Sequence, residues 1–158
     1  MDAGAQPPKV SVQEADFDIA AETDRLTAAS REIGAVVSFT GLVREMSGGV
    51  PLSGMELEHY PGMTERALEE IVAEAEARWP LDGVRVIHRV GPLAPGARIV
   101  LVLTASRHRR AAFEAAEFLM DYLKTRAPFW KKETGPDGAR WVDARETDTD
   151  AAARWSRG

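Results

Sequence analysis

Residues 122–133 read YLKTRAPFWKKE, and they contain the change from helix to strand on which the fold prediction depends. Proline has no backbone N–H and disfavours helical geometry in the residue before it, so residues 125–128 end a helix. The FWKKE that follows is typical of a short strand. A helix C-terminus attracts cations, but this accounts for only the first two of the four that surround the corner: Lys124, Arg126, Lys131 and Lys132.

Upstream of this corner, the sequence predicts a helix from about residue 107 to residue 124. It follows directly on ARIVLVLTAS (97–106), which has the apolar and β-branched composition of a buried strand. Five apolar side chains recur at helical spacing, and we expect them to face the core: Phe113, Ala116, Leu119, Met120 and Leu123.

The elements before this pair predict an α+β domain. Strands are expected at 34–41, 54–60 and 84–91, and residues 44–53 are typical of a mobile loop. A first helix is expected from an N-cap at Thr64 to Pro80. ARWVDA pairs with FWKKE around the GPDG turn as a short hairpin. This order favours one domain with a mostly antiparallel sheet.

Length and composition limit the possible classes of protein. The chain has 158 residues, 44% of them hydrophobic, which suits one domain. We expect a disordered lead-in at 1–9, the domain at 10–147 and a polar tail at 148–158. The absence of cysteine excludes disulfides and thiolate chemistry. No apolar run resembles a membrane span or a signal peptide, which favours a cytoplasmic protein.

Charge is distributed unevenly. The chain has a net charge of −5, which argues against general binding to nucleic acid. Residues 105–132 contain seven Lys and Arg against three Asp and Glu, so this segment carries +4 and the remainder −9. A basic region on an acidic protein suits a small anionic ligand.

The segment TASRHRR (104–110) places cations where a helix is expected to begin. Cations at a helix N-terminus oppose the macrodipole, and an anion bound at the free N–H groups would remove this conflict. The alternative is that these side chains extend into solvent or pair with surface carboxylates.

Lys124 and Lys131 lie on either side of the Pro128 corner, so the chain reversal could direct both amines into one cleft. Lysine binds anions when charged, and it acts as an acid, base or nucleophile when its pKa falls. Taken singly, each lysine is better explained as a solvated surface residue. His59 and His88 have no partners at metal-ligand spacing, and no phosphate-binding loop occurs, so no metal or nucleotide cofactor is predicted.

Five stretches together resemble the large, catalytic subunit of molybdopterin synthase, collinearly from about residue 34 to Trp155. They are GAVVSFTGLVR, LEHYPGMTERAL, VIHRVG, TASRHRRAAFEA and MDYLKTRAPFWKKE. The resemblance implies an α/β hammerhead fold. It also implies a homodimer that binds a small ubiquitin-like sulfur-carrier subunit at each end, giving a heterotetramer. The carrier's C-terminal Gly-Gly thiocarboxylate would supply sulfur to cyclic pyranopterin monophosphate, with no cofactor, to form the dithiolene of molybdopterin.

The resemblance also implies the site residues. Lys124 matches the catalytic lysine of the family, and Lys131 matches its second functional lysine. The substrate-binding positions correspond to Leu42, Val43, Arg44, His108, Arg109, Lys124, Lys131, Lys132 and Glu133. Leu42 departs from relatives that carry lysine, so only its backbone is expected to contribute. Two alternatives remain open: a non-catalytic anion-binding or regulatory module, and a scaffold for a ubiquitin-like partner.

Overall fold

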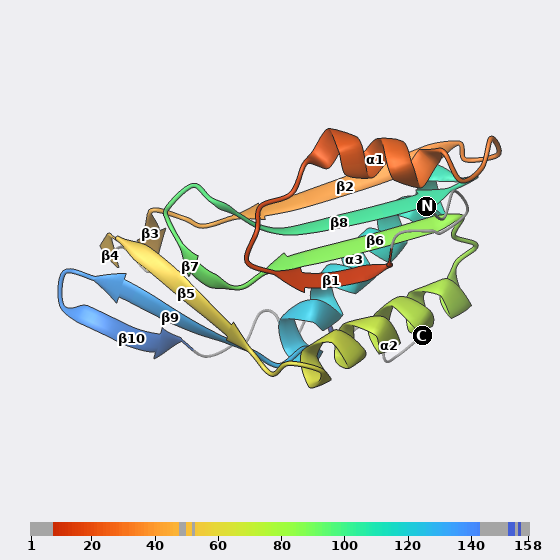
Figure 1. The fold of residues 1–158 in the computed structure, drawn as a ribbon. Helices are drawn as coiled ribbons and strands as arrows, with labels where there is room; N and C mark the ends of the chain where they lie inside the picture. The colour runs from red at the N-terminus through yellow and green to blue at the C-terminus, as the bar shows by residue number, and fades with distance from the viewer. Residues whose placement is uncertain (1–7, 48–49, 52, 143–151, 154, 156–158) are drawn as a thin grey trace.

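The computed structural model describes residues 8–47, 50–51, 53–142, 152–153 and 155 (Figure 1). Two four-stranded sheets are joined at one end, and three helices lie against the first of them. The α+β class is therefore confirmed. In the described part of the chain, no helix is long and apolar enough to cross a membrane.

The first sheet has the strand order β1-β6-β8-β2. Its members are β1 (Val10–Gln13), β6 (Gly83–Arg89), β8 (Arg98–Ser106) and β2 (Ala35–Leu42). The predicted antiparallel pairing holds for β2–β8 and β6–β8, whereas β1 runs parallel to β6. Strand β1 was not predicted from the sequence. Residues 98–106 are almost entirely buried because helices cover both faces of this sheet.

The second sheet has the order β10-β9-β5-β7 and is antiparallel throughout. Its strands are β5 (Gly54–His59), β7 (Gly91–Leu93), β9 (Phe129–Gly135) and β10 (Gly138–Val142). The predicted hairpin is thus part of a larger sheet, because β9 also pairs with β5 along its length. Strand β7 follows β6 directly along the chain, so it connects the two sheets (Figure 1).

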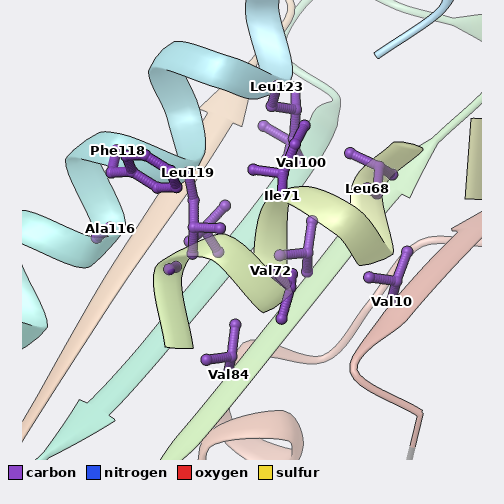
Figure 2. Close-up of a cluster of buried hydrophobic side chains, with 13 residues drawn as sticks. Val10, Leu68, Ile71, Val72, Val84, Val100, Ala116, Phe118, Leu119 and Leu123 are labelled. Carbon is purple, nitrogen blue, oxygen red and sulfur yellow. The ribbon is translucent and has the colours of Figure 1, made fainter. Parts of the chain in front are cut away.

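Helix α1 (Ile19–Thr27) covers one face of the first sheet, and α2 (Met63–Arg78) and α3 (Arg109–Arg126) cover the other. Helix α1 was not predicted; it begins at Asp18, whose carboxylate accepts a hydrogen bond from the Ala21 N–H. The main core lies between the first sheet, α2 and α3, and Figure 2 shows Leu68, Ile71 and Leu119 within it.

The prediction that Phe113 faces the core is wrong, because its side chain is 62% exposed. The buried face of α3 is instead centred on its alanines and on Phe118, which is completely buried. Small side chains let the helix approach β8 closely enough for the Thr104 hydroxyl to donate to the Ala112 carbonyl at 2.7 Å. Ala116, Leu119 and Leu123 are buried as predicted, and Met120 is half-buried.

The first predicted N-cap is also wrong, since α2 begins after Gly62 rather than at Thr64. Gly62 has a φ of 87°, a conformation that favours glycine, and its N–H donates to the Glu65 carboxylate at 3.1 Å. Thr64 lies inside the first turn and is completely buried. The apolar side chains of α2 that face the core are buried: Leu68, Ile71, Val72 and Ala75.

Three remaining predictions concern loops and ends. The loop expected at 44–53 contains a two-stranded pair, β3 (Met46–Ser47) and β4 (Val50–Pro51), around positions outside the described residues. Most of the lead-in and of the polar tail also falls outside them. Within the described part, the Lys9 amine pairs with Glu76, and the Trp155 ring packs edge-on against Trp79.

Candidate active site

Lys124 lies in the last turn of α3, at the end of the first sheet where the second sheet begins. Helix α3 runs antiparallel to β8, so its C-terminal end lies beside the Arg98 end of that strand. His88, near the end of β6, is close enough to Lys124 for the lysine charge to disfavour protonation of the imidazole and lower its pKa. The catalytic lysine of the prediction is therefore located at the junction of the two sheets.

His88 is buried at this junction and stays neutral. Its ring stacks on the Phe129 ring, with centroids 3.9 Å apart and an interplanar angle of 21°. Burial, as the main cause, lowers the pKa of His88 to about 4; the hydrogen bond to the Arg89 carbonyl acts in the opposite direction, and Lys124 and His59 lower it further. Its Nδ1 lies 2.8 Å from the Arg89 carbonyl oxygen, so His88 makes a structural hydrogen bond.

Lys131 and Lys132 are adjacent in β9 and lie on opposite faces of the second sheet, because side chains alternate along a strand. Lys131 shares the inner face with Phe129, and it stands opposite Leu57, which is buried. Lys132 faces outward, with its amine 5.7 Å from the centre of the Trp141 ring. Of these two predicted site residues, only Lys131 lies on the side of the sheet that carries Phe129.

Glu133 shares the inner face with Lys131 and is only 3% exposed. Its carboxylate oxygens lie 3.6 Å from the Lys131 amine and 4.0 Å from the Arg140 guanidinium. A buried carboxylate needs such cations to offset its lost hydration. Glu133 therefore holds the Lys131 amine against the sheet.

Leu42 is the last residue of β2, and Val43 and Arg44 follow it at the same junction. A register shift between Gly41 and Leu42 interrupts the pairing with β8 and leaves the Leu42 side chain 54% exposed. Val43 is buried in the core of the second sheet, and its N–H donates to the Ala97 carbonyl at 2.9 Å. Arg44 is exposed, and its guanidinium makes no ion pair within the described part of the chain.

His108 and Arg109 lie at the opposite end of α3. The helix begins at Arg109, with His108 as its N-cap, so the prediction that Arg107 opens the helix is wrong. The His108 N–H donates a hydrogen bond to the hydroxyl of Ser106, a residue that precedes the helix. As a result, Arg109 and Arg110 lie in the first helical turn, whereas Arg107 and His108 precede it.

Surface carboxylates neutralise part of this basic segment. Arg107 pairs with Glu32, and Arg110 pairs with Glu114 one turn later. The side chains of His108 and Arg109 have no hydrogen bond or ion pair to any residue that the structure describes. The alternative of carboxylate pairing thus applies to Arg107 and Arg110, and not to the two residues predicted to bind an anion.

The predicted site residues form two groups within one chain. Sixteen residues separate His108 from Lys124, which corresponds to about 24 Å along a helix. Leu42, Val43, Arg44, Lys124, Lys131 and Glu133 lie toward the junction, whereas His108 and Arg109 lie at the far end and Lys132 on the outer face. A single chain therefore does not bring all nine together.

Two residues that contact this junction were not predicted as part of the site. The Thr64 hydroxyl donates to the Pro128 carbonyl at 2.9 Å, and His88 stacks on Phe129. Val84, Val86 and His88 occupy successive positions on the inward-facing side of β6. A polar residue in an otherwise apolar series could have indicated from the sequence that His88 has a special role. No group of three or more metal-ligating side chains occurs among the residues described.

Comparison with known proteins gives consistent matches. The sequence model of the MoaE protein family matches residues 12–126. The molybdopterin synthase catalytic subunit of Mesorhizobium japonicum is 60% identical over 150 residues, covering 94% of this chain and 93% of its own.

Solved structures match over similar lengths. The molybdopterin biosynthesis MoaE protein of Burkholderia ambifaria has a TM-score of 0.81 and 54% identity, covering 94% of this chain and 97% of its own. A chain from the complex of subunits 1 and 2 of the molybdopterin-converting factor of Helicobacter pylori has a TM-score of 0.70 at 20% identity, covering 88% and 92%. The last similarity concerns the fold alone.

Proposed function

The chain belongs to the MoaE protein family and is an enzyme of molybdenum cofactor biosynthesis, and from this premise we propose that it catalyses the molybdopterin synthase reaction around Lys124. The substrate would be cyclic pyranopterin monophosphate. Sulfur would come from the C-terminal thiocarboxylate of a small ubiquitin-like carrier subunit. The observation that carries this proposal is the junction of the two sheets, where Lys124 lies beside the His88–Phe129 stack and Lys131 lies on the Phe129 face of β9.

The charges at the junction suit these reactants. Lys131 and Arg44 would bind the cyclic phosphate and the carboxylate that forms on the carrier, since both reactants are anionic. Val43 and Leu42 would contribute backbone groups beside them. Glu133 would keep the Lys131 amine directed along the sheet, given the 3.6 Å between the amine and a carboxylate oxygen. Lys132 would contribute only from the margin.

Lys124 would act on protons or by transient covalent attachment. In each transfer, the carrier sulfur would form a C–S bond at a side-chain carbon of the substrate as a C–O bond at that carbon breaks, and the departing oxygen would take up a proton or stay on the phosphate. Water would then cleave the acyl C–S bond, which leaves the sulfur on the substrate. Addition of water leaves the carrier as a carboxylate, and two carriers are consumed for each dithiolene. An amine can accept and return the protons of these steps, whereas a guanidinium hardly deprotonates.

A homodimer would complete the site with His108 and Arg109. Along α3, one exposed face carries Arg109, Phe113, Glu117 and Lys124, at successive spacings of four, four and seven residues, and Phe113 is 62% exposed. In a two-fold symmetric dimer formed along this face, the start of one α3 would approach the end of the other. Each composite site would then take Lys124 from one protomer and Arg109 from its partner.

The partner proposal rests on the family to which the chain belongs. The Helicobacter pylori chain was solved as a complex of subunits 1 and 2 of the molybdopterin-converting factor. A small carrier subunit bound to this chain would form the corresponding complex. Two such complexes joined through the α3 face would form a heterotetramer.

Reconstitution tests the proposed function directly. The purified protein is mixed with a thiocarboxylated carrier and cyclic pyranopterin monophosphate, and molybdopterin is measured by mass spectrometry. We expect product only when all three components are present, at two carriers per product. Carrier binding without any product would contradict the proposal and favour a scaffold.

A further inference from the structure

Ala127 and Pro128 connect α3 to β9, which begins at Phe129, and the segment Ala127–Phe129 is called the corner below. Ala127 has an extended backbone, and the Phe129 N–H donates to the Ala127 carbonyl at 3.0 Å. Pro128 has no N–H to donate. The corner therefore makes few hydrogen bonds of its own, although it sets the relative placement of Lys124 and Lys131.

Thr64 holds the corner from the side of α2. Its hydroxyl donates to the Pro128 carbonyl at 2.9 Å and accepts from the Tyr60 N–H, also at 2.9 Å. The side chain is completely buried, so it cannot touch a substrate. One hydroxyl thus links the corner to the turn between β5 and α2, 64 residues away in sequence.

His88 holds the corner from the side of the first sheet. Its ring lies flat on the Phe129 ring at 3.9 Å. The Arg89 carbonyl can only accept a hydrogen bond, so Nδ1 of His88 carries the proton and the 2.8 Å bond fixes the ring plane. Phe129 is consequently packed against a side chain that is itself fixed.

We propose that Thr64 and His88 are positioning residues of the reaction, which hold the corner from two sides so that Lys124 and Lys131 keep their mutual geometry. This inference rests on the proposed function, because it concerns the rate of the step that the two lysines carry out. A displacement of about 1 Å in a reacting group can cost about a hundredfold in rate. Loosening the corner should therefore lower kcat without removing any group that binds substrate.

The Thr64 hydroxyl can be tested with a matched pair of variants. Thr64→Val keeps the shape and removes the hydroxyl, whereas Thr64→Ser keeps the hydroxyl. We expect Thr64→Val to lower kcat about tenfold with KM within about twofold, and Thr64→Ser to retain most of the wild-type kcat. Amide hydrogen exchange at residues 129–131 should accelerate in Thr64→Val only.

A purely structural role would give a different result. Thr64→Val would then unfold at a lower temperature but keep its kcat well below that temperature, which would overturn the inference. Unchanged exchange at residues 129–131 would also overturn it. This second readout needs no substrate, so it remains decisive if the wild-type protein makes no molybdopterin and the proposed function fails.

A second pair of variants covers the case in which Thr64→Val does not fold. His88→Phe keeps an aromatic ring to stack on Phe129, whereas His88→Leu removes it. We expect His88→Phe to retain kcat within about threefold and His88→Leu to lose about tenfold, again with little change in KM. Equal kcat values for the two variants would overturn the role of the stack.

Discussion

The two ends of α3 carry the same kind of charge in different surroundings. At the C-terminal end, Lys124 and Arg126 complement the helix dipole, and Arg126 pairs with Glu74 on α2 at 2.6 Å. At the N-terminal end, Arg109 opposes the dipole, and it has no ion-pair partner among the described residues. The first end is consistent with helix stability alone, whereas the second is better explained by an anion or a partner.

The proposed dimer would explain why cations lie at both ends of α3. A reaction of anionic substrates requires several cations at one place, but cations at the start of a helix carry a cost of some tenths of a kcal/mol each. Supplying Arg109 from a second protomer would bring the charges together only in the assembled enzyme. The predictions below test this division of roles, beginning with the largest expected effect.

Removal of the amine at the C-terminal end should have the largest effect. We expect Lys124→Ala and Lys124→Arg each to lower kcat by about a hundredfold or more, because loss of a general acid or base costs 10²–10⁴-fold. The measurement is molybdopterin formation with saturating carrier. Lys9→Ala, which removes an exposed lysine paired with Glu76, should retain wild-type activity. Full activity of Lys124→Arg would favour a simple anion-binding role.

Mixing of variants should show whether the two ends act across protomers. We expect Arg109→Ala to lose about thirtyfold in kcat/KM, in the range for a lost charge-assisted hydrogen bond. The control is Arg110→Ala, which removes a neighbouring arginine already paired with Glu114.

Dimers reassembled from equal amounts of Lys124→Ala and Arg109→Ala should regain about a quarter of wild-type activity, since half are mixed and each of these has one intact site. The mixture is measured in the same assay as each variant alone. Activity no higher than that of the separate variants would contradict a site that combines Lys124 of one protomer with Arg109 of the other.

Lys131 and Lys132 are neighbours in β9 but lie on opposite faces of the sheet, so their variants should differ in effect. Lys131→Ala should lower kcat/KM by at least about tenfold, because it removes a cation beside the proposed pocket and leaves Glu133 less compensated. Lys132→Ala should lower it by less than about fivefold, since this side chain lies on the outer face. Steady-state kinetics of both variants test this order, and the reverse order would contradict the assignment of faces.

Acidification should lower the free energy of unfolding through His88, at the junction of the two sheets. His88 has a pKa of about 4 in the folded protein against an ordinary value of 6.5, so between these pH values the unfolded chain binds a proton that the folded chain does not. The free energy of unfolding should therefore fall by up to about 3 kcal/mol as pH falls from 6.5 to 4.

Urea unfolding at several pH values measures this slope. His88→Phe should flatten it, because the variant has no proton to bind at that position. Asp16 acts in a lower range: hydrogen bonds from Arg98 and Phe17 lower its pKa from 3.8 to about 2, so its stabilising effect is lost only below pH 3.8. Asp16→Asn should leave the slope above pH 4 unchanged, and an unchanged slope in His88→Phe would contradict the assignment.

Much of the fold followed from local patterns. The strands at 34–41, 54–60 and 97–106, the break at Pro128 and the hairpin after it were predicted, because each has periodicity or turn residues within a short window. Strand β1 and helix α1 were missed, since four strand residues and a short polar helix give little periodic signal. The exposed Phe113 was misplaced because spacing identifies an apolar face but not which neighbours cover it.

For the site, the sequence by itself determined the residue types and the break that separates them: two lysines around a proline, and a basic helix start. Residue types and a proline break are local properties of the sequence, so they do not depend on how distant segments pack. Only the tertiary structure decided that Lys131 and Lys132 face opposite ways, that Thr64 binds the Pro128 carbonyl and that Arg109 lies far from Lys124. Those relations depend on strand pairing and helix packing between distant segments, which no local pattern encodes.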